Sequence, residues 1–345
     1  MTAGTLRSNL FLSLVSVIVT LVLVELGLSL FHPIRFRRPL NPTPERWTRR
    51  VIDKRSLMYR RSSIPGLCYE LIPDKETRFL GEMIVTNSYG MRDSEPLPPS
   101  DTTACNVLVL GDSFTFGYAV PGEAAYPSVL EELLAGQVGD KPVQVLNLGV
   151  GGYATREEAI VLRHVVSDWR PSLIIVGYVL NDPEIDPVQP LHGYFSEPQW
   201  WQHLNILRLA ASTKLEWDIK RFGEGDYYRY LHAKNQRKWR SVVDAFDEMK
   251  DLAQAHNAPV VLVVFPVTKP QSWSDYPYLD LHEQVLDAGS ESGFHVIDMY
   301  DVYSQYPPED ISVTSRDFHP SVFAHELAAK VIYEFVENNS LLTCR

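Results

Sequence analysis

The alternation of apolar and polar residues separates a long apolar run near the N-terminus from a larger region of short, regularly spaced elements. In the larger region, compact apolar runs alternate with stretches whose apolar residues recur at helical spacing. The predicted elements, alternately strand and helix, span residues 106–113, 124–137, 143–150, 154–169, 172–180, 236–256, 258–267, 278–290, 294–300 and 320–337. The spacing is regular except between the strand at 172–180 and the long helix at 236–256, where the chain contains an insert. Near-continuous apolar strands alternating with helices predict an α/β domain with a doubly wound parallel sheet of about five strands.

The apolar run covers residues 10–31 and reads LFLSLVSVIVTLVLVELGLSLF, with Glu25 as its only charged residue. At ~1.5 Å per residue, a helix of this length roughly matches the ~30 Å hydrocarbon core of a bilayer. The run is longer than the ~7–15 apolar residues of a cleaved signal peptide. Gly27-Leu28-Ser29 is only a weak substitute for a cleavage site. We therefore expect residues 1–32 to form an uncleaved transmembrane anchor.

Three further segments differ from the regular α/β pattern. Residues 33–66 begin with prolines among arginines, which predicts a basic, Pro-rich juxtamembrane linker. Residues 67–105 contain short β-prone runs with Gly and Asn turns, which predicts a small strand-rich lead-in. We expect the main domain to span residues 106–340 and to contain an aromatic-rich insert at residues 183–235.

The formal net charge of −11 is unevenly distributed. Residues 1–61 hold 11 Lys/Arg and 3 Asp/Glu, whereas the remainder holds 21 Lys/Arg and 40 Asp/Glu. The acidic body argues against nucleic acid as a partner, and the basic stretch beside the apolar run suits anionic lipid headgroups. Cys68, Cys105 and Cys344 have no metal-type spacing; one pair could form a disulfide, but the sequence does not require it.

Residues suited to nucleophilic catalysis follow several of the predicted strands. Gly111-Asp112-Ser113 ends the first strand, a glycine-rich segment at 146–155 ends the second, and Asn181-Asp182 ends the third. Asp317 and His319 precede the last helix. Each residue alone fits a turn or a helix cap. Together they supply the nucleophile, base, acid and oxyanion donors of a serine enzyme at one edge of the sheet.

With these residues in place, the sequence resembles the SGNH (GDSL) hydrolase family over residues 106–337. The segment GDSFTFGYAV at 111–120 closely matches the first block of that family. The resemblance implies a flavodoxin-like layering of helices on the sheet. It also implies that Ser113 is the nucleophile, that its own N–H is an oxyanion donor, and that His319 is the general base.

The resemblance implies two more oxyanion donors. Gly152 matches the glycine of the second block, with Gly151 as its near competitor, and Asn181 matches the asparagine of the third block. The third block usually reads Gly-x-Asn-Asp, whereas this chain has Val179 at the glycine position. That change alters the loop and leaves the amide donor in place.

The acid position also departs from the family pattern. The fifth block usually reads Asp-x-x-His, but Arg316 occupies the acid position and Asp317 lies one residue nearer to His319. Either Asp317 orients the histidine, or His319 works in a dyad with a backbone carbonyl. The segment TNSYGMRD at residues 86–93 resembles a lead-in of membrane-anchored bacterial members, and no chemistry is assigned to it.

The resemblance implies a serine esterase acting through an acyl-enzyme on O-acyl esters, first of all O-acetyl esters, of envelope carbohydrate or lipid. The same Ser–His site suits an O-acyltransferase. The altered acid position leaves a non-catalytic glycan-binding or scaffold protein as the rival interpretation. We expect no cofactor and no metal ion, and His325 is interpreted as a packing or surface residue. The expected partners are the ester substrate and the membrane around residues 10–31.

The insert has three interpretations. Its aromatic residues, Trp200 and Trp201 among them, suit a lid or sugar-stacking platform, a packed helical excursion, or a surface that docks on the membrane interface.

The orientation in the membrane rests on two conflicting indications. Arg7 precedes the apolar run and six arginines follow it between positions 35 and 50, so the positive-inside rule alone places the following side in the cytoplasm. Short-tailed anchors of envelope enzymes usually translocate their large domain, and the family resemblance agrees. We expect a single-pass protein of the cell membrane with its catalytic domain on the extracytoplasmic, periplasmic side.

Overall fold

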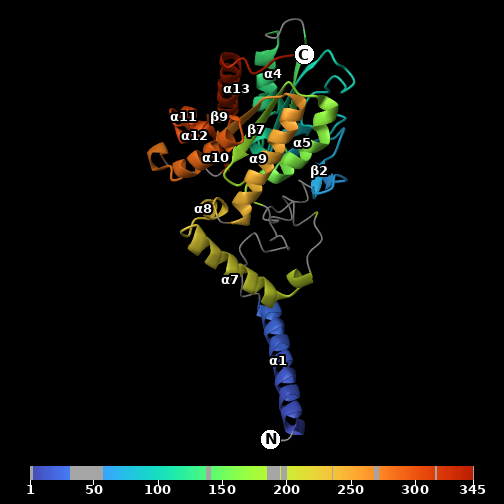
Figure 1. Ribbon diagram of the computed structural model, residues 1–345, viewed down its shortest axis with the longest axis vertical. Coiled ribbons are helices and arrows are strands. Elements are labelled where there is room, and N and C mark those ends of the chain that lie inside the picture. Colours follow the sequence, from blue (N-terminus) through green and yellow to red (C-terminus); the bar gives the residue numbers. More distant parts are fainter. Residues whose placement is uncertain are drawn as a thin grey trace.

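The computed structural model describes residues 3–31, 57–136, 141–184, 195, 200–234, 236–267, 272–314 and 317–344. Its longest helix, α1 (Ala3–Phe31), projects from one end of the α/β body (Figure 1). Residues Asn9–Leu30 of this helix are long and apolar enough to cross a membrane by length and composition, and the window with this composition is not buried within the protein. The expected apolar helix is therefore present.

Five strands form one parallel sheet, which confirms the predicted fold class. They are β5 (Cys105–Gly111), β6 (Val143–Asn147), β7 (Leu173–Val179), β8 (Val260–Phe265) and β9 (His295–Asp298). Strands β5, β7 and β8 are buried along their whole length, which explains their continuous apolar sequences. In the order β6-β5-β7-β8-β9, the chain reverses direction across the sheet between β5 and β7, where ligands bind in this fold class.

Helices cover both faces of the sheet (Figure 1). On one face α4 (Tyr126–Leu134) packs with α13 (Val322–Asn338), and on the other α5 (Thr155–Trp169) packs with α9 (Arg237–His256). Helix α10 (Leu279–Glu291) lies against β8 and β9. The insert contains α7 and α8, which span Asn205–Phe222 and Tyr227–Leu231. Short helical elements are α3 (Ser113–Phe116), α11 (Tyr300–Tyr303), α12 (Pro308–Ile311), η2 (Gly122–Ala124), η3 (Trp200–His203) and η4 (Trp273–Asp275).

Two small antiparallel sheets precede the main domain. They pair β1 (Tyr59–Arg61) with β2 (Tyr69–Leu71), and β3 (Glu76–Phe79) with β4 (Glu82–Val85). The strand-rich lead-in thus begins before residue 67, within the range expected to be linker. The reason is that the Tyr59 ring is buried and meets the Tyr69 ring edge-on, with 5.3 Å between ring centroids. Residues 33–56 of the expected linker lie outside the described residues.

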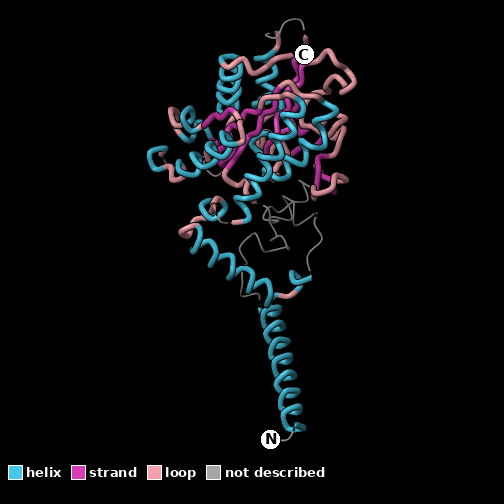
Figure 2. Tube along the Cα trace, in the orientation of Figure 1, coloured by secondary structure: helices cyan, strands magenta, loops and turns pink. Residues whose placement is uncertain are grey.

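The sheet has a defined direction relative to α1. A disulfide joins Cys105, the first residue of β5, to Cys344 in the C-terminal tail. The C-terminus lies at the end of the body that is farthest from α1 (Figures 1 and 2). Strand β5 and its parallel neighbours therefore begin at that end and run toward α1. The carboxyl edge of the sheet faces the end of the molecule that carries the apolar helix.

Candidate active site

Ser113 stands at the turn where β5 ends and α3 begins. Gly111 makes this turn with φ of 156°, and a Cβ atom at this position would collide with the side chain of Thr115. Asp112 caps the short helix, since its Oδ1 accepts a hydrogen bond of 2.8 Å from the N–H of Phe114. The turn therefore presents the Ser113 hydroxyl at the carboxyl edge of the sheet.

His319 and Asp317 approach Ser113 from a separate two-stranded ribbon. Strand β11 (Asp317–Pro320) pairs antiparallel with β10 (Ser312–Thr314). His319 Nε2 lies 2.9 Å from Ser113 Oγ, and His319 Nδ1 lies 2.6 Å from Asp317 Oδ1. Side chains two residues apart in a strand point to the same side, which brings Asp317 to the far ring nitrogen of His319. The three side chains form one connected series.

The three residues predicted as oxyanion donors also lie around this point. Gly152 follows β6 with φ of 85°, a left-handed conformation that favours glycine. Within the described part of the chain, the N–H groups of Ser113 and Gly152 donate to no backbone carbonyl. The side-chain Nδ2 of Asn181 donates a 3.1 Å hydrogen bond to Asp112 Oδ2. Because an amide nitrogen carries two hydrogens, this bond orients Asn181 and leaves one hydrogen for another acceptor.

These residues line a cavity of about 580 Å³ at the carboxyl edge of the sheet. Its lining includes Ser113, Gly151, Gly152, Asn181, Asp317 and His319. The insert contributes Tyr227 and Tyr228 from α8, and the lead-in contributes Tyr59. Trp200 and Trp201, the aromatic pair expected as a sugar platform, are absent from the described lining. Of the aromatic residues of the insert, Tyr227 and Tyr228 are therefore the ones in the described lining.

The model of the GDSL-like Lipase/Acylhydrolase family matches residues 109–327. The chain belongs to this family. The match starts within β5 and extends into α13, so it includes both the Ser113 turn and the His319 strand. It confirms the resemblance read from the sequence, and it supports an ester-bond hydrolase as the class of this GDSL-family protein.

Several solved structures are similar to this GDSL-family chain. TesA is 12% identical and covers 68% of this chain and 98% of its own, with a TM-score of 0.44. The lipase/acylhydrolase from Enterococcus faecalis is 18% identical, with coverages of 70% and 98% and a TM-score of 0.42. The acetyl xylan esterase AlAXEase is 14% identical, with coverages of 67% and 99% and a TM-score of 0.44. The search of curated proteins gave no match.

Arg92 is a supporting residue that the sequence did not reveal. It lies in the 86–93 segment, is only 2% exposed, and donates to the carbonyl oxygens of Phe116, Gly117 and Val120. Burial lowers the pKa of Arg92 to about 10, which still leaves the guanidinium charged at neutral pH. The 86–93 segment therefore holds the loop that follows α3. No spacing signal indicates this contact, because Arg92 and Phe116 are 24 residues apart.

Three buried carboxyl groups lie in or beside the site. Burial raises the pKa of Asp112, and hydrogen bonds from Phe114 and Asn181 oppose that rise. Burial raises the pKa of Glu158 and Asp182 well above the usual range, and the charges of neighbouring carboxylates raise them further. Neither carboxyl oxygen of Glu158 has a hydrogen-bond partner in the described part of the protein. This environment favours the protonated form of Glu158.

His325 lies in the interior of the α/β body. His325 is buried, its Nδ1 accepts a 3.2 Å hydrogen bond from the N–H of Tyr126, and burial lowers its pKa to about 3. It is a packing residue, as one of the two interpretations held. Among the described residues there is no group of three His, Cys, Asp or Glu side chains suited to a metal ion. Arg316 lies outside the described residues.

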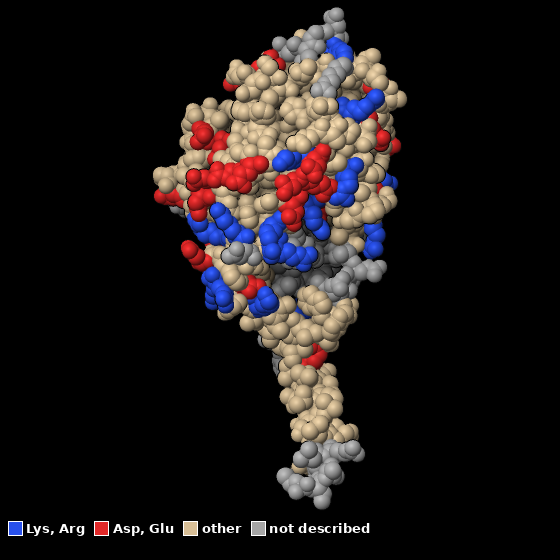
Figure 3. Space-filling model, in the orientation of Figure 1, with Lys and Arg blue, Asp and Glu red and all other residues tan. Residues whose placement is uncertain are grey.

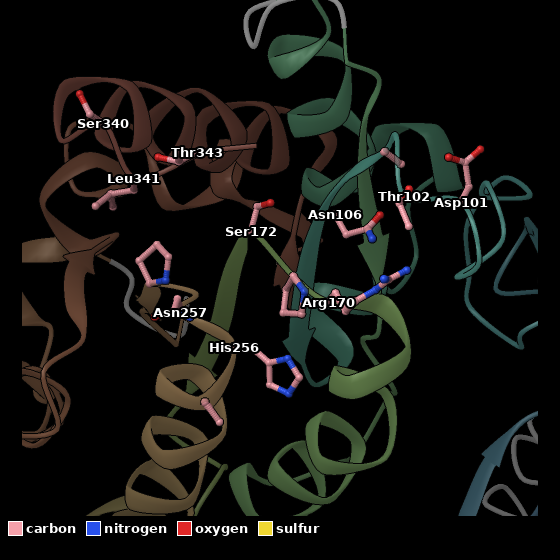
Figure 4. A pocket seen from close by; sticks show the side chains of 14 residues that line it. Asp101, Thr102, Asn106, Arg170, Ser172, His256, Asn257, Ser340, Leu341 and Thr343 are labelled. Carbon is pink, nitrogen blue, oxygen red and sulfur yellow. The ribbon is translucent and has the colours of Figure 1, made fainter. Parts of the chain in front are cut away.

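A second cavity, of about 610 Å³, lies at the amino-terminal edge of the sheet (Figure 4). Asn106, Arg170 and Ser172 line it near the starts of β5 and β7, together with Leu341 of the C-terminal tail. Ligands of doubly wound sheets bind at the carboxyl edge. This cavity lies at the opposite edge from Ser113, so the candidate active site is the cavity around the serine.

Proposed function

We propose that this protein is a membrane-anchored serine esterase that removes O-acyl groups, first of all O-acetyl groups, from carbohydrate or lipid of the cell envelope. The observation that carries the proposal is the hydrogen-bonded series Ser113, His319 and Asp317, with separations of 2.9 Å and 2.6 Å. This is the arrangement that activates a serine hydroxyl.

In the proposed reaction, Ser113 Oγ attacks the ester carbonyl carbon while its proton passes to His319 Nε2. The carboxylate of Asp317 accepts the Nδ1–H of His319 and so stabilises the imidazolium that forms. The tetrahedral intermediate then collapses, the bond to the alcohol oxygen breaks, and His319 returns the proton to that oxygen. Water repeats the sequence on the acyl-enzyme and releases the carboxylic acid.

The negative oxygen of the intermediate needs donors that are already in place. The N–H groups of Ser113 and Gly152 and the Nδ2 of Asn181 are the proposed donors. The buried carboxyl of Asp112 fixes the Asn181 amide before any substrate arrives. Its role in the proposal is to orient the donor.

Two features support the proposed location. Helix α1 has the length and composition of a single membrane span. The disulfide between Cys105 and Cys344 supports an extracytoplasmic body, because disulfides persist mainly in oxidising compartments. Tyr59, Tyr227 and Tyr228 in the cavity wall support a carbohydrate or lipid alcohol, since aromatic rings pack against the apolar faces of both.

Labelling the purified protein with a serine-directed fluorophosphonate tests the proposal. We expect one label per chain, located on Ser113 by peptide mass spectrometry and lost in Ser113→Ala. Ser128→Ala, which changes a partly buried serine of α4, is the matched control and should label like the wild type. A folded protein that takes no label would favour the non-catalytic scaffold.

The acceptor of the acyl group, water or a sugar hydroxyl, distinguishes hydrolysis from transfer. Unlabelled enzyme that releases free acetate from an acetylated oligosaccharide is an esterase. Acetate that appears on an added acceptor sugar in place of water would make it an O-acyltransferase that uses the same acyl-enzyme.

A further inference from the structure

The single charged residue of the apolar run, Glu25, binds the N-terminus of α7. Its Oε1 accepts hydrogen bonds from the backbone N–H and side-chain Nδ2 of Asn205, at 2.8 and 2.9 Å, and its Oε2 accepts from the N–H of Ile206 at 2.9 Å. Ser29 Oγ accepts a further hydrogen bond of 3.0 Å from Asn205 Nδ2. The N-cap residue of α7, Leu204, provides no side-chain cap of its own. Glu25 therefore caps a helix that is 180 residues away in the chain.

This contact fixes the depth of the first turn of α7. Glu25 lies five residues before Leu30, the end of the apolar stretch. At about 1.5 Å per residue, the contact lies roughly 7–8 Å inside that end. Backbone N–H groups at such a depth require a partner, because lipid offers none. The Glu25 carboxylate supplies that partner to two of them, and its own charge is stabilised by the same bonds.

The residues next to this contact have the composition of a membrane interface. Trp200 in η3 is 72% exposed and Leu204 is 38% exposed, although both adjoin the capped turn. Tryptophan is favoured at the level of lipid headgroups. These side chains are exposed in the isolated protein and lie where a bilayer around α1 would cover them.

The segment from η3 to the start of α9 carries a charge complementary to anionic lipid. Residues 200–240 contain nine Lys/Arg and four Asp/Glu, the reverse of the acidic character of the whole chain. Figure 3 shows Lys and Arg gathered on the part of the body nearest α1, next to a band rich in Asp and Glu farther away. On helix α7, Arg221 lies over the ring of the exposed Trp217 at 4.8 Å. Basic and aromatic side chains together are typical of helices that lie on membranes.

From these observations we propose that η3 and the first turn of α7 form a second membrane contact, which Glu25 holds in place and which lies between the headgroups and the outer acyl chains of anionic phospholipid. The inference rests on the proposed anchor and deepens the proposed function. The carboxyl edge of the sheet, with Ser113, faces the same end of the molecule. The enzyme is thereby directed toward lipid esters of the bilayer that holds α1.

Depth-dependent fluorescence quenching tests the contact in the full-length protein. The protein is reconstituted in vesicles of phosphatidylcholine and phosphatidylglycerol brominated near the headgroup end of the acyl chains. The difference between wild type and Trp200→Phe isolates the emission of Trp200, and Trp217→Phe isolates the more distant Trp217 of the same helix. We expect strong quenching of Trp200 and weaker quenching of Trp217. Equal emission of Trp200 in brominated and ordinary lipid would overturn the contact.

A substitution at Glu25 tests its consequence for substrates. Glu25→Leu removes the cap and keeps an apolar span, whereas Glu25→Gln keeps one acceptor oxygen. From the strength of polar contacts between membrane helices, we expect Glu25→Leu to lower kcat/KM for a vesicle-borne lipid ester by about three- to fifteenfold. Glu25→Gln should lose less, and hydrolysis of a soluble aryl acetate should not change. Equal loss on both substrates, or no loss on either, would overturn the proposed role.

The outcomes distinguish this inference from the proposed function. A chain that hydrolyses aryl acetate but leaves Trp200 unquenched is an esterase without the second contact. A chain that hydrolyses neither substrate while Trp200 is quenched has the contact without the proposed activity. Extraction of the full-length chain from vesicles by carbonate would show that α1 is not an anchor, and both quenching and lipid-ester preference would then be absent.

Discussion

The ring of Tyr118 stacks on the imidazole of His319, with 4.1 Å between the ring centroids and 29° between the ring planes. Tyr118 belongs to the loop whose carbonyl groups are held by the buried guanidinium of Arg92. The lead-in segment thus supports the proposed base indirectly, through a loop and a ring. We therefore propose that the 86–93 segment has a positioning role in the reaction.

Replacement of Tyr118 tests that role. We expect Tyr118→Ala to lower kcat by roughly two- to tenfold, the value of one aromatic stack, with KM nearly unchanged. Tyr118→Phe keeps the ring and should retain most of the activity. For both variants, kcat and KM are measured with a soluble aryl acetate, together with the rate of fluorophosphonate labelling. A loss in KM alone would mean that Tyr118 contacts substrate and does not position His319.

The oxyanion assignment of Asn181 gives a second prediction. Asn181→Ala removes the donor while Asp112 keeps its hydrogen bond from Phe114. We expect kcat to fall by about 10²–10³-fold with the fold preserved, as is usual when one oxyanion donor is lost. Steady-state kinetics measure the fall in kcat, and circular dichroism checks that the fold is preserved. A well-folded variant with less than about threefold loss would show that the amide does not face the developing charge.

Much of this architecture was predictable from local sequence patterns. The buried strands β5, β7 and β8 appear as continuous apolar runs because both faces of each strand are covered. Asp317 and His319 could be paired in advance because two residues in an extended segment point to one side. In both cases the prediction needed only residues that are close together in the sequence.

The features that sequence analysis missed depend on contacts between distant residues. The Cys105–Cys344 disulfide closes a separation of 239 residues, and the choice among three cysteines required the course of the chain. In the sequence, Glu25 is a single charge near the end of an apolar run. Only the structure shows that it accepts hydrogen bonds from the first residues of α7. Spacing rules describe one element at a time, so they do not show which distant element supplies a partner.

Buried Glu158 gives a prediction about stability and pH. Its folded-state pKa is raised above the ordinary value of 4.5, so the folded chain binds this proton more tightly than the unfolded chain. The stabilisation is complete below the unfolded value and is lost as pH rises through the folded pKa. Glu158→Gln removes this loss. We expect its Tm to exceed that of the wild type increasingly as pH rises above 4.5.

The effect should amount to a few degrees, since about 1 kcal/mol shifts the Tm of a domain the size of residues 106–340 by roughly 2–4 °C. Thermal melts across a pH series measure it. Glu132→Gln, on the exposed side of α4, is the matched control and should follow the wild type at every pH. A constant offset between Glu158→Gln and wild type would mean that packing, and not ionisation, separates them.

The role of Asp317 as the acid partner of His319 can be argued from both the sequence and the geometry of the site. The usual acid position of the family block holds Arg316 in this chain, and an arginine cannot accept a hydrogen bond from His319. The carboxylate of Asp317 lies 2.6 Å from Nδ1, on the side of the ring opposite Ser113. In the proposed reaction it fixes the tautomer in which Nε2 is free to accept the serine proton. It also stabilises the imidazolium once the proton has moved.

We therefore expect Asp317→Asn to keep the fold and to lose activity by several orders of magnitude, toward the ~10⁴-fold of a triad whose acid becomes an amide. An asparagine amide can donate to Nδ1, which favours the wrong tautomer, so the pH–rate profile should also lose its simple histidine-controlled limb. Asp301→Asn, which changes an exposed carboxylate of α11, is the matched control and should leave kcat unchanged. Near-full activity of Asp317→Asn, beside inactive Ser113→Ala and His319→Ala, would identify a Ser–His dyad. In that case the short contact at Nδ1 would serve the folding of β11, and Asp317→Asn would lower Tm without lowering kcat.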